Sequence, residues 1–377
     1  MTKLYILLAV SIVLAYLYEN TYVPTLNGPK RPKYLYVALV AVLICFNGFR
    51  GEYNDTWTYR DAYVHLVKGF PEAWEHLSWD LGDNPGFELI QSWFKTYNTD
   101  VHLLLMFFGF WTVLFDMQFI KRYSINLVFG VYLFFTTGCY VFTLAAIKQC
   151  MAVAICLMAI PYANDRKWGR FLLLVLFSSL FHPYSLLYLI VPFMYFRPWT
   201  KASYVLLAII VAGGLLLEPL LGTVVDITAA LGKEYSENSF RGEGISIIRL
   251  LACAAPVILS FAYRREIFRD STREQHLFVN LSMIYAGILF VGLFGNPMYF
   301  SRLALYFAIM PVIALPWMLS KINPRYRQLI TAVAVVGYFG YFYYTHAIET
   351  HFDSSYSALT LQQFWHYLYE ALSGGAA

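Results

Sequence analysis

Long apolar stretches recur along almost the whole chain, and they limit its possible folds more than any other feature. Many of them reach the length of about 20 residues that a helix needs to cross the roughly 30 Å hydrocarbon core of a bilayer. Helices satisfy every backbone hydrogen bond within their own segment, which lipid surroundings demand. Of the 377 residues, 59% are hydrophobic and only 13% are charged. We therefore predict an all-α polytopic membrane protein, with residues 1–377 forming one integral membrane domain.

We expect about twelve membrane-spanning helices, because apolar stretches of suitable length are separated by short polar connections. The expected spans are residues 3–19, 33–49, 101–120, 125–142, 145–163, 168–181, 183–196, 202–221, 245–263, 277–294, 303–320 and 328–345. Two neighbouring stretches, 168–181 and 183–196, are short for spans, since a helix rises about 1.5 Å per residue. They form either two full spans or a short hairpin with its tip below the membrane surface, and His182 lies at the floor of a recess in both cases.

Basic residues gather in every second connection between the expected spans. Six such connections hold 17 of the 27 Lys and Arg residues. They are residues 30–33, 121–122, 166–170, 197–201, 264–273 and 321–327. Loops rich in Lys and Arg face the cytoplasm. Both termini and the remaining connections are therefore predicted to lie outside.

The largest outer connection covers residues 50–100 and contains nine acidic and four basic residues. Within it, residues 73–79 and 87–97 mix aromatic and aliphatic side chains with polar ones at helical spacing, which predicts amphipathic helices on the membrane surface. A second outer loop, residues 222–244, is mixed in charge and bounded by glycines. Such a segment is suited to act as a mobile flap.

Several polar residues that are not cytoplasmic anchors fall on the same predicted side of the membrane. They are Arg50, Asp55, Glu88, Lys148, Gln149, His182, Arg249 and Arg302. Ionisable groups at membrane depth are unfavourable unless they are paired or solvated, and they therefore mark functional sites by default. Their convergence predicts an active site that faces one compartment.

Each of these residues also has an ordinary structural explanation. Lys148 has no acidic residue within a helical turn to pair with. Its ordinary explanation is a lysine whose ammonium group extends to the membrane interface. Arg302 is predicted to open a helix, where the dipole disfavours a cation unless an anion is near; its alternative is an interfacial arginine. Asp55 is alternatively a solvated loop acid, His182 a packed histidine, and Arg249 is the weakest candidate. The nearby aromatic residues, among them Tyr53, Trp57, Tyr59 and Tyr63, suit either an interfacial belt or stacking on sugar rings.

Other chemistries lack sequence support. The chain has no Walker A motif, no dinucleotide-binding glycine pattern, no H-E-x-x-H and no G-x-S-x-G. Its five cysteines lie in or beside apolar stretches and indicate neither disulfides nor a metal site. No basic stripe on a soluble domain points to a nucleic-acid partner. A secondary transporter stays open, because transporters also contain isolated charges and broken helices.

Five motifs, taken together, resemble the EpsG-like family of Wzy-type polymerases for bacterial exopolysaccharides and capsules. They are FRGEYNDTWTY at 49–59, GFELI at 86–90, IKQCMAVAI at 147–155, LFHPYSLLYL at 180–189 and SRLALYF at 301–307. The resemblance covers roughly residues 33–320. The family pattern has arginine before the glutamine of the third motif, where this chain has Lys148. The compact ammonium of lysine therefore replaces the planar guanidinium of arginine, which can donate two parallel hydrogen bonds.

The resemblance implies an enzyme that joins oligosaccharide repeat units, carried on undecaprenyl pyrophosphate, at the outer face of the bacterial cytoplasmic membrane. It further implies a glycosyltransferase of the GT-C-like type that acts with inversion, without a cofactor, and beside a flippase and a chain-length regulator. Alternatives are an O-antigen-ligase-type transferase and a transporter of lipid-linked glycans or other substrates.

The resemblance also assigns roles to the candidate residues. Arg50, Lys148, Arg249 and Arg302 would neutralise the leaving pyrophosphate, and Asp55 or His182 would take the proton of the acceptor hydroxyl. Gln149, Tyr59 and Glu88 complete the expected substrate site. Asp55 with Glu88 could instead hold a divalent cation, although no metal site is predicted.

Overall fold

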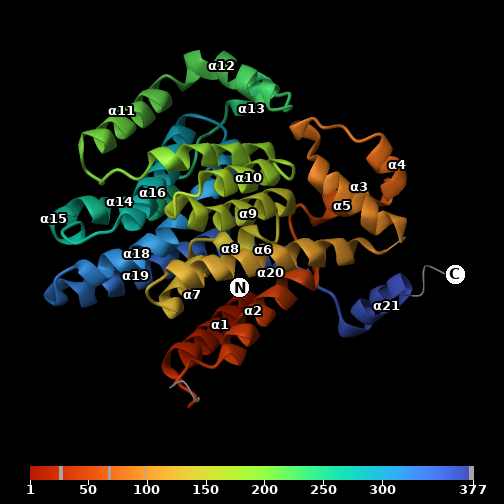
Figure 1. Cartoon of the computed structure of the whole chain (residues 1–377), viewed down its shortest axis with the longest axis horizontal. Coiled ribbons are helices and arrows are strands. Elements are labelled where there is room, and N and C mark those ends of the chain that lie inside the picture. Colours follow the sequence, from red (N-terminus) through yellow and green to blue (C-terminus); the bar gives the residue numbers. More distant parts are fainter. Residues whose placement is uncertain (25–28, 67–68, 98, 373–377) are drawn as a thin grey trace.

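The protein is almost entirely helical. A computed structural model describes residues 1–24, 29–66, 69–97 and 99–372, and within them the only sheet has two short strands (Figure 1). The first half of the chain contains α1 Thr2–Asn20, α2 Lys33–Gly48, β1 Arg50–Glu52, α3 Thr56–Val64, α4 Phe70–Glu75, η1 Leu81–Asp83, α5 Pro85–Thr96, α6 Val101–Tyr123, α7 Leu127–Thr136, α8 Cys139–Phe142, α9 Ile147–Asn164, α10 Trp168–Ser179 and η2 Pro183–Phe193. The second half contains α11 Lys201–Leu215, α12 Leu217–Ala230, α13 Glu237–Phe240, α14 Ile247–Ala262, α15 Arg264–Ile267, α16 Arg273–Val291, η3 Gly292–Phe294, α17 Pro297–Ala304, η4 Leu305–Phe307, α18 Met310–Lys321, α19 Pro324–Tyr343, η5 Tyr344–Glu349, α20 Phe352–Ser355, β2 Ser357–Ala358 and α21 Leu361–Leu372.

Several helices have the length and composition of membrane spans. In the described part of the chain these are α1, α6, α9 and the continuous segment of α16 and η3, which makes four. The count rises to six if two bent pairs, α11 with α12 and α17–η4 with α18, each form one span. Five shorter apolar helices, α2, α7, α10, η2 and α14, accompany them. This arrangement is compatible with a polytopic membrane protein, and the number of twelve spans stays a prediction.

Two of the predicted spans are not straight. Residues 202–221 divide between α11 and α12, which meet at an angle of 97°. Residues 303–320 divide between the end of the α17–η4 segment and α18, which meet at 56°. Pro219 and Pro311 lie in the first turns of α12 and α18, where proline is tolerated because its missing N–H needs no helical partner. Since α12 runs to Ala230, the first part of the predicted loop 222–244 is helical.

The centre of the molecule is α9, which packs between α6 and α10 (Figure 1). Its buried face contains many small residues, among them Ala152, Ala154 and Ala159, all fully buried. Small side chains let neighbouring helices approach closely, which is a common way of packing helices in membranes. The two short segments 168–181 and 183–196 correspond to α10 and η2, which pack against each other, with His182 between them; the choice between two full spans and a short hairpin stays open.

The six basic connections lie at one end of the molecule, which we call the basic end. Lys121, from the second connection, lies 3.7 Å from the ring centroid of Tyr36 at the start of α2. Arg273 lies 3.8 Å from the ring centroid of Tyr195, and Arg197 donates to the Phe268 carbonyl. These contacts join connections that are far apart in sequence, as the charge pattern predicts.

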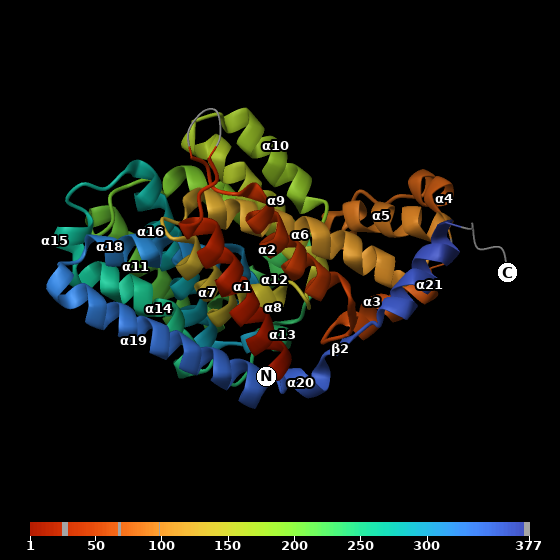
Figure 2. The ribbon, with the colours of Figure 1, turned by 90° about the horizontal axis from the view of Figure 1, so that it is seen from below.

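The opposite end, which we call the site end, brings both termini to the region of β1. The two strands pair antiparallel, with Arg50 opposite Ala358, and the amide of Leu359 donates to the Phe49 carbonyl. The terminal amino group of Met1 pairs with Asp353, and Figure 2 shows the N-terminus beside α20. Both ends of the described chain therefore lie at the site end.

The region of residues 50–100 folds as α3, α4, η1 and α5, grouped beside the site end (Figures 1 and 2). The helix expected at 87–97 is α5, whereas the helix expected at 73–79 is α4 and ends earlier, at Glu75. Trp74, Trp79 and Trp93 remain exposed, as suits helices that lie on a membrane surface. Residues 80–84 contact the 222–244 segment, where the Lys233 ammonium donates to the Gly82 carbonyl.

The two ends should differ in their access to an impermeant thiol reagent. We expect Glu75→Cys, at the site end, to be labelled by such a reagent in whole cells. We expect Lys201→Cys, at the basic end, to be labelled only after the membrane is permeabilised, because basic loops stay in the cytoplasm. Both positions are exposed, and the parent protein gives the background from its own cysteines. The opposite labelling pattern would overturn the predicted topology.

Candidate functional site

The first contact of the candidate site joins residues from the two ends of the sequence. Arg302 Nη2 lies 3.2 Å from Asp55 Oδ2. Asp55 directly precedes α3, and Arg302 lies in the last turn of α17. The Asp55 side chain is 24% exposed, and its Oδ1 atom makes no hydrogen bond within the described residues. One carboxylate oxygen therefore stays available to another partner.

The prediction that Arg302 opens a helix is wrong. Helix α17 begins five residues earlier, at Pro297, where the Asn296 side chain accepts a hydrogen bond from the Met298 amide and Pro297 occupies the first turn. Asn before Pro is a strong helix start, and the sequence interpretation overlooked it. A cation in the last turn is favoured by the helix dipole, so Arg302 suits its position even apart from Asp55.

Gln149 fixes the backbone beneath Arg302. Its side-chain amide is buried in the first turn of α9 and donates to the Arg302 carbonyl. The amide nitrogen is thereby used within the protein. Gln149 therefore positions Arg302, which differs from the substrate contact that the sequence suggested.

His182 lies between α10 and η2, and its Nδ1 atom lies 2.8 Å from the Tyr306 hydroxyl. Burial, together with the nearby charges of Lys233, Arg302 and Lys148, lowers the pKa of His182 from 6.5 to about 3. The imidazole is therefore neutral at physiological pH. The three cations lie within electrostatic reach of His182, and we call Lys148, Lys233 and Arg302 the cationic cluster.

Lys148 reaches this cluster from the first turn of α9. Its ammonium lies 4.4 Å from the ring centroid of Phe87, a favourable cation–π contact. Lys233 and Glu88 lie within electrostatic reach of it. No described carboxylate forms an ion pair with Lys148, so its charge is not neutralised by direct contact.

Lys233 is a member of the cluster that the sequence analysis missed. It comes from the 222–244 segment and is held by the Gly82 carbonyl. Burial lowers the pKa of Lys233, and the charges of Asp83 and Asp80 oppose that effect. Its place in a loop is the only signal for it in the sequence, since a lone lysine among polar residues is ordinary.

Arg50 makes a different set of contacts from Asp55, although the two are close in sequence. Its side chain is fully buried, and Nη1 donates to Asn47 Oδ1 over 3.3 Å, while Nε and Nη2 have no partner in the described structure. Burial lowers the pKa of Arg50 to about 10. The Asp55 carboxylate makes its ion pair with Arg302. Complete burial does not fit direct contact with a substrate.

Tyr59 lies within electrostatic reach of both Arg50 and the Asp55–Arg302 ion pair. Burial is the main cause that raises the pKa of Tyr59, and the negative charge of Asp55 raises it further. The positive charges of Arg302 and Arg50 lower this pKa. All three charged residues therefore lie near the Tyr59 hydroxyl. Of the other aromatic residues proposed for sugar stacking, Tyr53 and Tyr63 are buried, whereas Trp57 is exposed.

The five sequence motifs are connected by these contacts. The Gly86 amide donates to the Leu180 carbonyl over 2.8 Å, which joins the second motif to the fourth. Asp55 and Gln149 both contact Arg302, and His182 contacts Tyr306. Segments separated by up to about 250 residues in sequence thus build one site.

A family model described as the EpsG family matches residues 33–368. The chain belongs to the EpsG family. The match covers nearly the whole chain, including all five motifs, so the resemblance first noted on short stretches is confirmed at full length. Searches of curated proteins and of solved structures give no match.

The remaining predicted residues of this EpsG family member are placed as follows. Glu88 lies in the first turn of α5 and is half-buried. Arg249 lies in α14 with its guanidinium carbon 5.7 Å from the Phe142 ring centroid, and the groups that act on its charge are Tyr341, Tyr285, Cys253 and Glu349. The structure therefore does not bring Arg249 to the site. No group of three or more His, Cys, Asp or Glu residues suited to a metal occurs among the described residues.

A neutral buried His182 has a consequence for stability. The unfolded chain binds a proton at this histidine below about pH 6.5, whereas the folded protein resists protonation until about pH 3. The contribution of neutral His182 to the free energy of unfolding is therefore fully present above about pH 6.5 and is lost as the pH falls towards 3. We expect the melting temperature of the parent protein to fall more between pH 7.5 and pH 5 than that of His182→Gln.

The matched control is His65→Gln, because the His65 side chain is 75% exposed. This variant should keep the pH dependence of the parent protein. Equal pH dependence of the parent and His182→Gln would contradict a neutral His182.

Proposed function

We propose that this EpsG family member is a polysaccharide polymerase that joins lipid-linked oligosaccharide repeat units. The convergence of Lys148, Lys233 and Arg302 around the neutral His182, with Asp55 at the edge of the group, is the observation that carries the proposal. Family membership supports it. Only one of the three cations is ion-paired among the described residues, so the cluster is suited to bind a polyanion such as pyrophosphate.

In the proposed reaction, the acceptor hydroxyl attacks the sugar carbon that carries the undecaprenyl pyrophosphate. The new C–O bond forms as the bond from that carbon to the phosphate oxygen breaks, and the pyrophosphate leaves with the electron pair. Lys148, Lys233 and Arg302 stabilise the negative charge that develops on it. Attack from the face opposite the leaving group inverts the configuration at the sugar carbon.

Asp55 is the proposed general base that accepts the hydroxyl proton. Its Oδ2 atom is held by Arg302 and its Oδ1 atom has no partner in the described structure. His182 is the weaker candidate, because its Nδ1 atom is already engaged with the Tyr306 hydroxyl at 2.8 Å. We assign His182, with Tyr306, to orienting the acceptor, and the exposed ring of Trp57 to sugar stacking.

The cellular setting belongs to the same proposal. The site faces the outside of the cytoplasmic membrane, opposite the basic end, within a GT-C-like scaffold of about twelve spans. A flippase that delivers the repeat unit and a chain-length regulator are the partners such an enzyme would need.

The proposal is tested by incubating the purified protein with a lipid-linked repeat unit alone. A ladder of products, separated by one repeat unit each, is expected and would identify a polymerase. Reaction only after a second acceptor is added would indicate a ligase. Uptake into vesicles without any new glycosidic bond would indicate a transporter.

Variants of the cationic cluster should reveal how each charge acts. We expect Lys148→Arg to keep more polymerase activity than Lys148→Ala, because a point charge suffices there. Arg302→Ala should lower the turnover roughly 100-fold, the effect of removing one donor from a developing anion. Arg302→Lys should restore only part of it, because lysine lacks the planar fork.

Arg60→Ala is the matched control, since Arg60 lies in the same region and pairs with Glu52 in an exposed ion pair. Such pairs contribute little, and its activity should stay near that of the parent. Normal turnover in both Lys148→Ala and Arg302→Ala, at normal protein levels, would remove the pyrophosphate assignment.

A further inference from the structure

An apolar cavity of about 380 Å³ lies beside the cationic cluster. This volume is within the range of roughly 300–1,000 Å³ that ligand pockets occupy. Its walls come from η2, α12, α13 and α17, and nearly all of its lining side chains are aliphatic or aromatic. A cavity of this kind is suited to a hydrocarbon ligand.

One wall of the cavity is a continuous face of α12. Val224, Ile227, Thr228 and Leu231 line it, and their spacing of three, four and seven residues places them on the same side of the helix. They extend over roughly 10 Å of the helix axis, given a rise of 1.5 Å per residue. Ile227 is 57% exposed, so an apolar surface remains open along this wall.

The opposite part of the cavity adjoins residues next to the proposed pyrophosphate site. Two lining residues, Pro183 and Leu303, directly follow His182 and Arg302 in sequence. The lining residue Tyr184 has its ring centroid 5.1 Å from that of His182, and its hydroxyl is hydrogen-bonded to Tyr235. The Tyr235 hydroxyl in turn lies within electrostatic reach of Arg302. The cavity therefore begins where the cationic cluster ends.

We propose that this cavity binds the polyprenyl chain of the donor, at the segment next to its pyrophosphate. The inference rests on the proposed function, because it takes its head group from that site. An amphiphile with an anionic head and an apolar chain needs both surfaces side by side, and burial of its hydrocarbon in the cavity adds affinity through the hydrophobic effect. The chain would be held between α12 and η2, with the pyrophosphate directed at Arg302 and Lys148.

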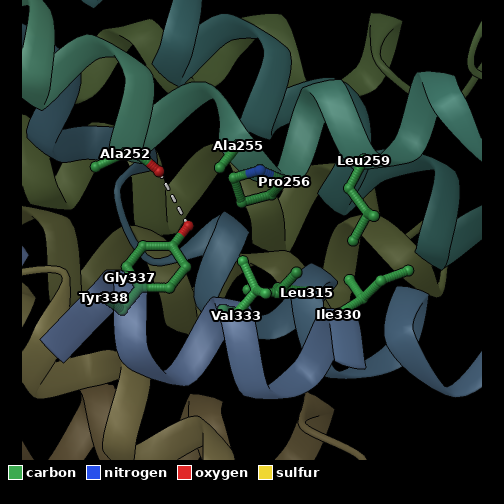
Figure 3. Close-up of a pocket in the computed structure, with 10 residues that line it drawn as sticks. Ala252, Ala255, Pro256, Leu259, Leu315, Ile330, Val333, Gly337 and Tyr338 are labelled. Carbon is green, nitrogen blue, oxygen red and sulfur yellow. Dashed lines mark hydrogen bonds between the residues drawn. The ribbon is translucent and has the colours of Figure 1, made fainter. Parts of the chain in front are cut away.

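The protein has a second apolar cavity that serves as a control. It occupies about 300 Å³ between α14, α18 and α19, and Figure 3 shows Leu259 and Val333 projecting into it from two of these helices. The Tyr338 hydroxyl donates to the Ala252 carbonyl over 3.0 Å, so this polar atom is already paired. No charged residue lines this cavity, and it lacks the adjoining cationic site.

The experiment measures binding of two probes to the full-length protein in nanodiscs. One probe is undecaprenyl pyrophosphate without sugar, and the other is inorganic pyrophosphate. We expect the parent protein to bind both, and the polyprenyl probe more tightly. Leu187→Trp and Leu231→Trp narrow the cavity and should weaken binding of the polyprenyl probe roughly tenfold or more. Both variants should keep the affinity for inorganic pyrophosphate, which also reports that the site remains folded. Leu315→Trp, in the control cavity, should change neither affinity.

The outcomes separate this inference from the proposed function. Failure of the parent protein to bind inorganic pyrophosphate would remove the pyrophosphate site itself. The cavity assignment alone would be overturned if the parent protein bound inorganic pyrophosphate normally but bound the polyprenyl probe no more tightly. It would also be overturned if Leu231→Trp kept full affinity for the polyprenyl probe. Equal competition by phosphatidylglycerol would show a general lipid site and would also overturn it.

A photoreactive polyprenyl pyrophosphate gives a second readout that does not depend on variants. Crosslinks to residues 224–231 are expected, and crosslinks confined to residues 330–338 would contradict the proposal.

Discussion

The ion pair between Asp55 and Arg302 is the contact on which the rest of the candidate site depends. It ties the region that follows α2 to α17, near the other end of the chain, and Gln149 fixes the same arginine through its backbone carbonyl. A charge at membrane depth is tolerated when it is paired or solvated. Because Asp55 is the only carboxylate in direct contact with this group of cations among the described residues, Lys148 and Lys233 keep their charges for an external anion. A site built in this way attracts a polyanion without being neutralised by its own protein.

Arg50 contributes to the same site in a different way. A fully buried guanidinium with two unpartnered nitrogens is unfavourable unless the surrounding structure holds it in place. The pairing of β1 with β2, and the bond from the Tyr356 hydroxyl to the Phe46 carbonyl, provide that support from the C-terminal segment. From this buried position the charge of Arg50 reaches the Tyr59 hydroxyl.

The two outer segments have distinct parts in this arrangement. The 50–100 region provides Asp55, Phe87 and Glu88, and the 222–244 segment provides Lys233 together with one wall of the apolar cavity. Their contact at Gly82 and Gly232 is so close that a Cβ atom on Gly82 would lie 1.8 Å from the Gly232 carbonyl oxygen. Gly232 also has a φ of +74°, which favours glycine. Both glycines are therefore required for the two segments to pack together this closely.

The sequence by itself determined the helical, apolar character of the chain, the grouping of basic residues at one end and most of the residues of the candidate site. These follow from local properties: helical periodicity, segment length and the cost of charges in lipid depend on neighbours in sequence. The packing of the segments before and after His182 was among the predicted alternatives for the same reason. The partner of each charge was decided only by the tertiary structure, because Asp55 lies five residues from Arg50 in sequence but pairs with Arg302 in space. The same holds for Lys233, whose role depends on how a distant loop packs, and for Arg249, which shares the predicted side with the site residues but lies elsewhere. Sequence order constrains which segment a side chain belongs to, whereas the bends between α11 and α12 and between η4 and α18 decide which segments meet.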